Sequence, residues 1–287
     1  MNPSGRTVLL PVDLDDKTLF RLERSYENLK FLADRIIVLY VLENLGHLSS
    51  DRDRKDLIAK KDALLSDLAD DIRSKTGAEV RPVLQKGKAS EEILNAAESY
   101  NADLIAMSTH THPEDDHTEK HTLGATTNRV VRESKVPVFT FNSNVRLKHI
   151  RKIVLPLDLT VETRQKVTYA IDMAMLFKAS IHVVSVLWST HIEDIRAELQ
   201  QQMDQVKNFI LEDGIECSTK LIETEGNTKA LATSVLKYAD EIDADLIMIM
   251  TQQETKLVEF FLGSSAQTII RLSNIPVMSI IPKDLGV

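Results

Sequence analysis

Two stretches of sequence decide the fold: Thr7-Val-Leu-Leu-Pro-Val-Asp13 and Lys152-Ile-Val-Leu-Pro-Leu-Asp158, whose prolines lie 145 positions apart. Each is a short apolar run that closes on Pro-x-Asp. Four further blocks recur in the same order: Arg35–Val41 with Ser180–Val186, Ala102–Ile105 with Ala244–Ile247, Leu123-Gly124 with Leu262-Gly263, and Val136-Pro137-Val138 with Ile275-Pro276-Val277. Because five blocks keep one order, chance matching is excluded and the chain is a tandem repeat. The predicted domains span residues 1–145 and 146–287.

Strands and helices alternate within each copy. In the first copy, apolar and β-branched runs predict strands over residues 8–12, 36–42, 79–84, 103–107 and 136–141. Between them, apolar residues recur at helical spacing, as in Leu57, Leu64, Leu68 and Ile72. Strands that are apolar on both faces and alternate with amphipathic helices indicate a parallel sheet covered by helices on each side. We therefore predict two five-stranded, doubly wound α/β domains, in which ligands lie beyond the carboxyl ends of the strands.

Composition and charge exclude several classes of protein. With 35 basic and 43 acidic residues the net charge is −8, which does not favour general binding to nucleic-acid phosphates. The longest apolar run, Ile36–Leu42, is far shorter than the roughly 20 residues that a membrane span needs. The single cysteine, Cys217, has no partner for an internal disulfide, and no apolar signal segment precedes the first strand. We expect a cytoplasmic protein that binds neither nucleic acid nor membrane.

Three features recur where strands end or helices begin. Asp13 and Asp158 follow the first strand of each copy, and Val41 and Val186 end the second. Small residues open the last helix of each copy, as Gly124-Ala-Thr126 and Gly263-Ser264-Ser265. A small-residue turn at a helix start exposes unpaired backbone N–H groups and the positive end of the helix dipole, which suits an anion. The alternative is a simple N-cap, which is the more common use of such residues.

The repeated pattern resembles the universal stress protein family. The resemblance rests on Pro-Val-Asp at the first strand, Gly87-Lys-Ala-Ser-Glu-Glu-Ile before Ala102-Asp-Leu-Ile, Leu-Gly-(Ala/Ser)-(Thr/Ser), and the final Val-Pro-Val. It covers nearly the whole chain. It implies Rossmann-like sandwich domains of the adenine nucleotide alpha hydrolase type, paired through their last strands as a pseudo-dimer within one chain. A further homodimer and unidentified protein partners are also compatible with it.

One subclass of that family binds ATP through Gly-x-x-Gly-(nine residues)-Gly-Ser/Thr. The resemblance implies that the aspartate and the end of the second strand meet the adenosine part, and that the small-residue turn meets phosphate. The cofactor-binding residues implied in this way are Asp13, Val41, Gly124, Thr126, Asp158, Val186, Gly263, Ser264 and Ser265.

This sequence departs from that loop in both copies. Met250 and Gln253 stand at the two glycine positions of the second copy, and Ser108-Thr-His-Thr111 occupies the same point in the first. A side chain narrows the close backbone approach that glycine allows. We therefore predict a non-catalytic, stress-response regulator with degenerate ATP loops. The alternative is an ATP-binding switch that acts through the second domain. A hydrolase ranks last, because no base or metal-binding acid can be assigned.

Four of the eight histidines cluster in one segment: His110, His112, His117 and His121. In an extended segment the first two point to the same side, and the last two share a face if Pro113 opens a helical turn. The two pairs together would suit one divalent ion, with zinc or nickel preferred by imidazole. The other interpretation is a solvated polar insertion. A metal-binding protein is thus the second alternative function.

Overall fold

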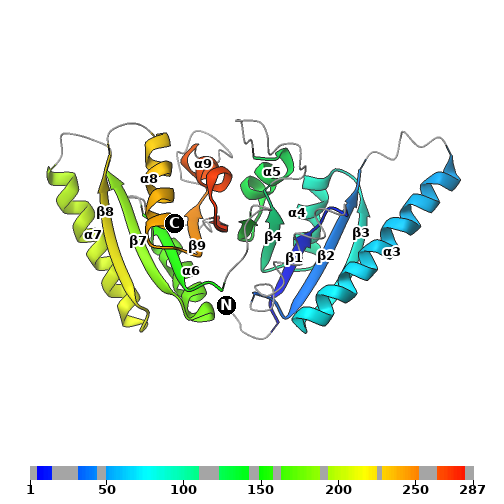
Figure 1. Cartoon of the computed structure of the whole chain (residues 1–287), viewed down its shortest axis with the longest axis horizontal. Helices are drawn as coiled ribbons and strands as arrows, with labels where there is room; N and C mark the ends of the chain where they lie inside the picture. Colours follow the sequence, from blue (N-terminus) through cyan, green and yellow to red (C-terminus); the bar gives the residue numbers. More distant parts are fainter. Residues whose placement is uncertain are drawn as a thin grey trace. The chain divides into compact units, whose positions relative to one another are not determined.

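The computed structural model describes residues 5–14, 32–43, 50–109, 123–141, 149–157, 163–187, 193–224, 228–251 and 264–281. The chain divides into two compact units, with the division between Leu147 and Lys148. Each unit is an α/β domain built on a parallel sheet of five strands, as the sequence predicts (Figure 1).

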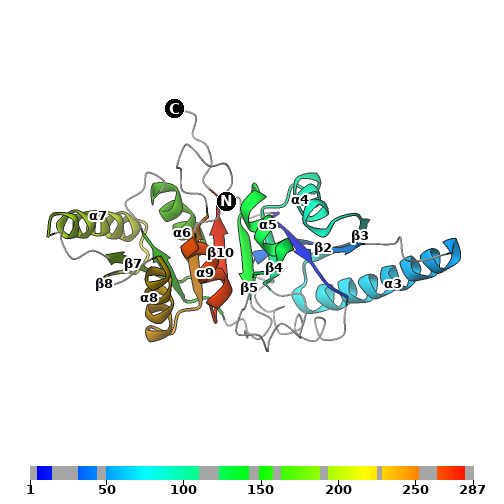
Figure 2. The ribbon, with the colours of Figure 1, turned by 90° about the horizontal axis from the view of Figure 1, so that it is seen from above.

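The first unit carries the strand order β3-β2-β1-β4-β5. Its elements, in chain order, are β1 (Thr7–Pro11), β2 (Arg35–Leu42), α3 (Asp51–Thr76), β3 (Glu79–Lys86), α4 (Ala89–Ser99), β4 (Leu104–Ser108), α5 (Ala125–Glu133) and β5 (Val138–Phe141). Helix α3 lies on one face of the sheet and α4 on the other (Figure 2). The central strand β1 is apolar and almost fully buried because it is covered on both faces.

The second unit repeats this plan with the strand order β10-β9-β6-β7-β8. Its elements are β6 (Lys152–Pro156), α6 (Thr163–Phe177), β7 (Ser180–Leu187), α7 (Glu193–Glu212), β8 (Cys217–Glu223), α8 (Thr228–Glu241), β9 (Leu246–Met250), α9 (Ser264–Leu272) and β10 (Val277–Ile280). None of the helices in the described part of the chain is both long and apolar enough to span a bilayer.

Matching hydrogen bonds confirm that the two units are copies. Asp103 Oδ2 accepts the backbone N–H of Thr7 at 2.8 Å, and Asp245 Oδ2 accepts that of Lys152 at 3.0 Å. Ser134 Oγ donates to the carbonyl of Val136, and Ser273 Oγ donates to that of Ile275. Even the rare left-handed backbone recurs, with φ of 47° at Asn101 and 51° at Asp243. Such details follow from duplication and not from shared composition.

Candidate functional site

In each unit the first strand lies in the middle of the sheet. The chain adds the next two strands on one side of it and then crosses over to add the last two on the other side. Strand β1 is flanked by β2 and β4, and β6 is flanked by β7 and β9. In a doubly wound sheet this switch point opens a crevice at the carboxyl ends of the strands, where ligands bind. The residues that the sequence singles out lie near these strand ends, so the switch points at β1/β4 and at β6/β9, called the first and the second crevice below, are the candidate sites.

In the first unit, the turn after β1 carries the predicted Asp13, which is half-buried. The backbone N–H of Val12 bonds to the carbonyl of Leu39 at 2.9 Å, which ties this turn to the second strand. Tyr40, on β2, has its pKa raised mainly by burial and secondarily by the negative charge of Asp13. Asp13 therefore lies close enough to Tyr40 for its negative charge to influence the ionisation of the phenol.

Helix α3 adds a cation that the sequence did not suggest. Lys61 Nζ donates to the carbonyl of Leu14 at 3.3 Å and lies 5.3 Å from the centre of the Tyr40 ring, a cation–π distance. The Asp13 turn is thus bordered by a phenol ring and an ammonium group. Lys61 was missed from the sequence alone, although helical spacing could have indicated it, because Lys61 lies on the same side of the helix as Leu57 and Leu64.

The predicted anion-binding residues of the first unit lie at the start of α5. Gly124 caps the helix with φ −53° and ψ 141°, and no side chain supplies a cap bond. The N–H of Gly124 bonds to the carbonyl of Thr109 at 3.4 Å, and the hydroxyl of Thr127 donates to the carbonyl of Ser108 at 3.1 Å. Thr126 is half-buried in the first turn. The helix start is therefore tied to the end of β4.

The second unit is described only in part at its candidate site. Asp158 and Gly263 lie outside the described residues, as does Gln253, and Ser264 opens α9. Val186 and Ser265 are half-buried, near the end of β7 and in the first turn of α9. Met250 ends β9 with only 7% of its surface exposed, so its side chain packs in the core.

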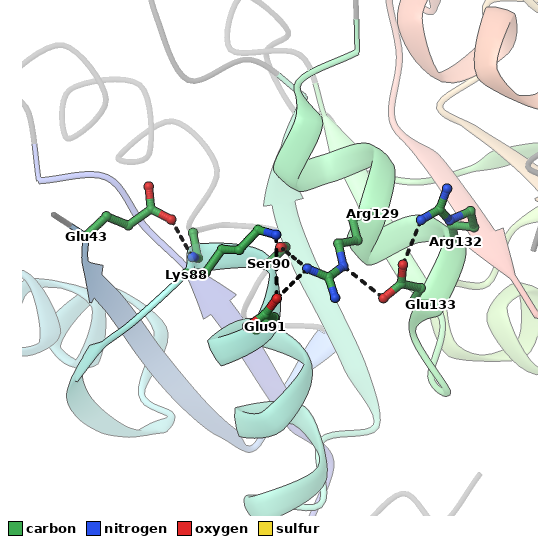
Figure 3. Close-up of polar contacts among 8 residues, drawn as sticks. Glu43, Lys88, Ser90, Glu91, Arg129, Arg132 and Glu133 are labelled. Atoms are coloured by element: carbon green, nitrogen blue, oxygen red, sulfur yellow. Dashed lines mark hydrogen bonds and ion pairs between the residues drawn. The ribbon is translucent and has the colours of Figure 1, made fainter.

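An ion-pair network that the sequence did not suggest links α4 to α5 in the first unit (Figure 3). Arg129 donates from Nη1 to Glu91 Oε1 at 2.7 Å and from Nε to Glu133 Oε2 at 3.0 Å. Arg132 reaches the other oxygen of Glu133 at 2.7 Å. The Arg129 hydrogen bond lowers the pKa of Glu91, and the Arg132 hydrogen bond is the largest cause that lowers the pKa of Glu133. The network is an alternating chain of charges held at the helix surface.

A carboxylate also closes the start of α4. Glu43 follows β2, and its Oε1 accepts the backbone N–H of Ala89 at 2.5 Å (Figure 3). The first turn of α4 thus meets an internal anion, the interaction that a helix N-terminus favours. Ser90 and Lys88 border the same turn, where Ser90 Oγ lies 3.3 Å from Arg129 Nη1. Lys88 Nζ is 3.5 Å from Glu91.

The predicted metal ligands His110, His112, His117 and His121 lie outside the described residues. Among the residues that are described, no group of three or more His, Cys, Asp or Glu side chains is arranged to hold a metal ion. The zinc hypothesis therefore stays a prediction about the histidine segment alone.

The strand order and the repeated elements define a protein of two tandem, doubly wound α/β domains. The sequence profile of the universal stress protein family matches residues 5–141 and 149–280. The chain therefore belongs to the universal stress protein family and carries two of its domains in tandem.

Individual relatives agree with this assignment. The universal stress protein MJ0531 of Methanocaldococcus jannaschii is 26% identical over 141 residues, 45% of this chain and 80% of the relative. A solved universal stress protein from Archaeoglobus fulgidus covers 97% of both chains, with a TM-score of 0.75 and 22% identity. A functionally unknown protein, PA1789 from Pseudomonas aeruginosa, covers 98% of this chain and 94% of its own, with a TM-score of 0.67 and 19% identity. The two solved structures share the tandem fold.

Proposed function

We propose that this chain is a non-catalytic, regulatory universal stress protein whose two ATP loops are degenerate. The observation that carries the proposal is the engagement of the first helix start by the protein itself. The Gly124 N–H and the Thr127 hydroxyl both bond to carbonyls at the end of β4. A phosphate would have to compete with these bonds, and the second loop has Met250 and Gln253 where ATP-binding relatives place glycine.

Calorimetric titration with Mg-ATP tests this proposal. We expect no binding tighter than about 1 mM and no rise in melting temperature, since a ligand stabilises the folded state appreciably only when its concentration exceeds the dissociation constant. Phosphate release from ATP should stay at the rate of a protein-free control. A dissociation constant below about 10 µM, or turnover above that control, would contradict the proposal.

The second candidate is an ATP-binding switch that uses the second domain. It is supported by the Gly263-Ser264-Ser265 turn and by the place of Ser265 in the first turn of α9. If ATP binds, Ser265→Ala should weaken binding while Thr126→Ala, the matched change in the first unit, should leave it intact. The reverse result would assign binding to the first domain.

Zinc binding by the histidine segment is the third candidate. Four imidazoles within twelve residues support it. Calorimetry with zinc should give a one-site isotherm that is lost in the His117→Ala/His121→Ala double variant and kept in His47→Ala. Equal heats for all three proteins would end the idea.

We also propose that the two domains pair through their last strands within one chain. Each five-stranded sheet ends on a short strand, β5 or β10, and an open strand edge invites pairing. Thr140→Cys with Ser279→Cys, placed at equivalent positions and combined with Cys217→Ser, should form an intrachain disulfide under mild oxidation. Only intermolecular cross-links would indicate a homodimer instead.

A further inference from the structure

A lysine lies on the buried face of α6. Only 4% of the surface of Lys166 is exposed, although lysine is among the residues least often buried. It falls on the same helical stripe as Val167, Ala170 and Ala174, all of them buried and apolar. The neighbouring residues on this side of the helix are apolar. Burial of a charged group is unfavourable in free energy unless the group has a hydrogen-bond partner nearby.

The side chain reaches the switch point of the second unit. Lys166 Nζ donates to the carbonyl of Pro156 at 2.5 Å, and Pro156 is the last residue of β6. The geometry is expected, because α6 begins at the carboxyl edge of the sheet and helical side chains lean toward the helix N-terminus. Since β6 lies between β7 and β9, its carboxyl end borders the ligand crevice of a doubly wound sheet.

Other buried polar groups at this edge also bond to the protein's own carbonyls. Ser185, 2% exposed, donates from Oγ to the carbonyl of Leu157 at 2.9 Å. Thr251, also 2% exposed, donates to the carbonyl of Ile280 at 3.3 Å. At this edge the carbonyls of Pro156, Leu157 and Ile280 therefore accept hydrogen bonds from buried side chains of the protein itself, and Lys166 is the largest of these side chains.

We propose that the Lys166 side chain, held by its hydrogen bond to Pro156, fills the space in the second crevice that the adenosine part of a nucleotide would need. This inference rests on the proposed function, because it supplies a second reason why the second domain does not bind ATP. A base that entered would have to move the Lys166 side chain and break its hydrogen bond to Pro156, which is unfavourable for a buried ammonium group.

The first copy has a cation at the matching position of the sequence. Arg21 stands ten residues after Pro11, as Lys166 stands ten residues after Pro156. Arg21 lies outside the described residues, so the inference concerns the second unit alone.

The test is calorimetric titration with adenosine, which carries no phosphate and therefore does not depend on the loop at Met250 and Gln253. We expect no binding by the wild type or by Lys237→Ala, a control whose lysine side chain is 80% exposed. Lys166→Ala should gain adenosine binding by at least about tenfold, to below roughly 100 µM. Lys166→Met should gain none, because its side chain fills the same space. A folded Lys166→Ala variant that gains nothing would overturn the inference.

A second measurement does not need any variant. Under reductive methylation of the wild type, Lys166 should react at least about tenfold more slowly than Lys237, because only a few per cent of it is exposed. Equal rates would overturn the closure. ATP binding by the wild type that Asp13→Ala abolishes, with Lys166 still protected from methylation, would instead overturn the proposed function and leave this inference standing.

Discussion

The helix pair α4–α5 of the first unit and the pair α8–α9 of the second share one backbone plan and differ in chemistry. Their buried sides match: Ile93 and Val130 in the first pair correspond to Val235 and Ile269 in the second. Their rims do not. The positions of Glu91, Arg129 and Glu133 are taken by Thr233, Thr268 and Leu272, counted from the repeated Ala102/Ala244 and Val136/Ile275 blocks.

This difference shows which interactions stabilise both domains and which ones are found in the first domain only. The buried apolar contacts recur because each sheet needs a covered face, and burial is the main stabilising term. The ion pairs do not recur, and exposed ion pairs contribute little to stability. The charged rim is thus a property of the first domain that the fold does not require, and the domains can differ in their partners without differing in architecture.

The largest effect is expected from matched changes in the two cores. Ile105 and Ile247 are both fully buried on the equivalent strands β4 and β9. Ile105→Ala and Ile247→Ala should each lower the free energy of unfolding by about 2–5 kcal/mol in urea denaturation, since both leave a cavity. Costs that differ by more than about 2 kcal/mol would show that the two cores are not equivalent.

A smaller effect is expected at the aspartates that hold the first strand of each copy. Asp245 accepts the N–H groups of Arg151 and Lys152, at 2.8 and 3.0 Å, whereas Asp103 accepts that of Thr7. We expect losses of about 1 kcal/mol for Asp103→Ala and about 1.5 kcal/mol for Asp245→Ala by thermal unfolding, because a charged acceptor strengthens each bond. Loss of stability in only one of the two variants would contradict the matched roles.

The contribution of the charged rim to the melting temperature should depend on salt concentration. Arg129→Met should lower the melting temperature at about 20 mM salt. It should have little effect at about 1 M salt, where interactions between exposed charges are strongly screened. Thr268→Met, the matched change in the second unit, should show no such salt dependence. A loss in Arg129→Met that persists at high salt would mean that packing, and not charge, explains it.

The smallest effect concerns pH. His182 on β7 lies 2.7 Å from Ser218 Oγ and 3.0 Å from Ser180 Oγ, and the equivalent position in the first unit is Ile37. Burial is the main cause that lowers the pKa of His182 below 6.5, so the folded state favours the neutral ring. The stabilising effect is present above about pH 6.5 and is lost as pH falls below it. His182→Gln should flatten that slope in pH-dependent thermal unfolding; an unchanged slope would assign it to other groups.

Sequence periodicity predicts the fold well because buried parallel strands must be apolar on both faces, and the Pro-x-Asp blocks mark where two of them end. Asp13 and Gly124 lie at the carboxyl edge of the first sheet for the same reason. The Glu91–Arg129 pair was missed because its members are 38 residues apart, and only the packing of α4 on α5 brings them together. Lys166 was missed because a lysine in a helix normally marks the solvated face, and here its stem lies along the core.

The most direct test of the account is a crystal structure of the full chain grown with Mg-ATP. We predict strands and helices of two superimposable domains with no ordered triphosphate at the carboxyl edge of either sheet. A triphosphate bound over residues 250–253 and the start of α9, with Lys166 turned away from Pro156, would contradict it.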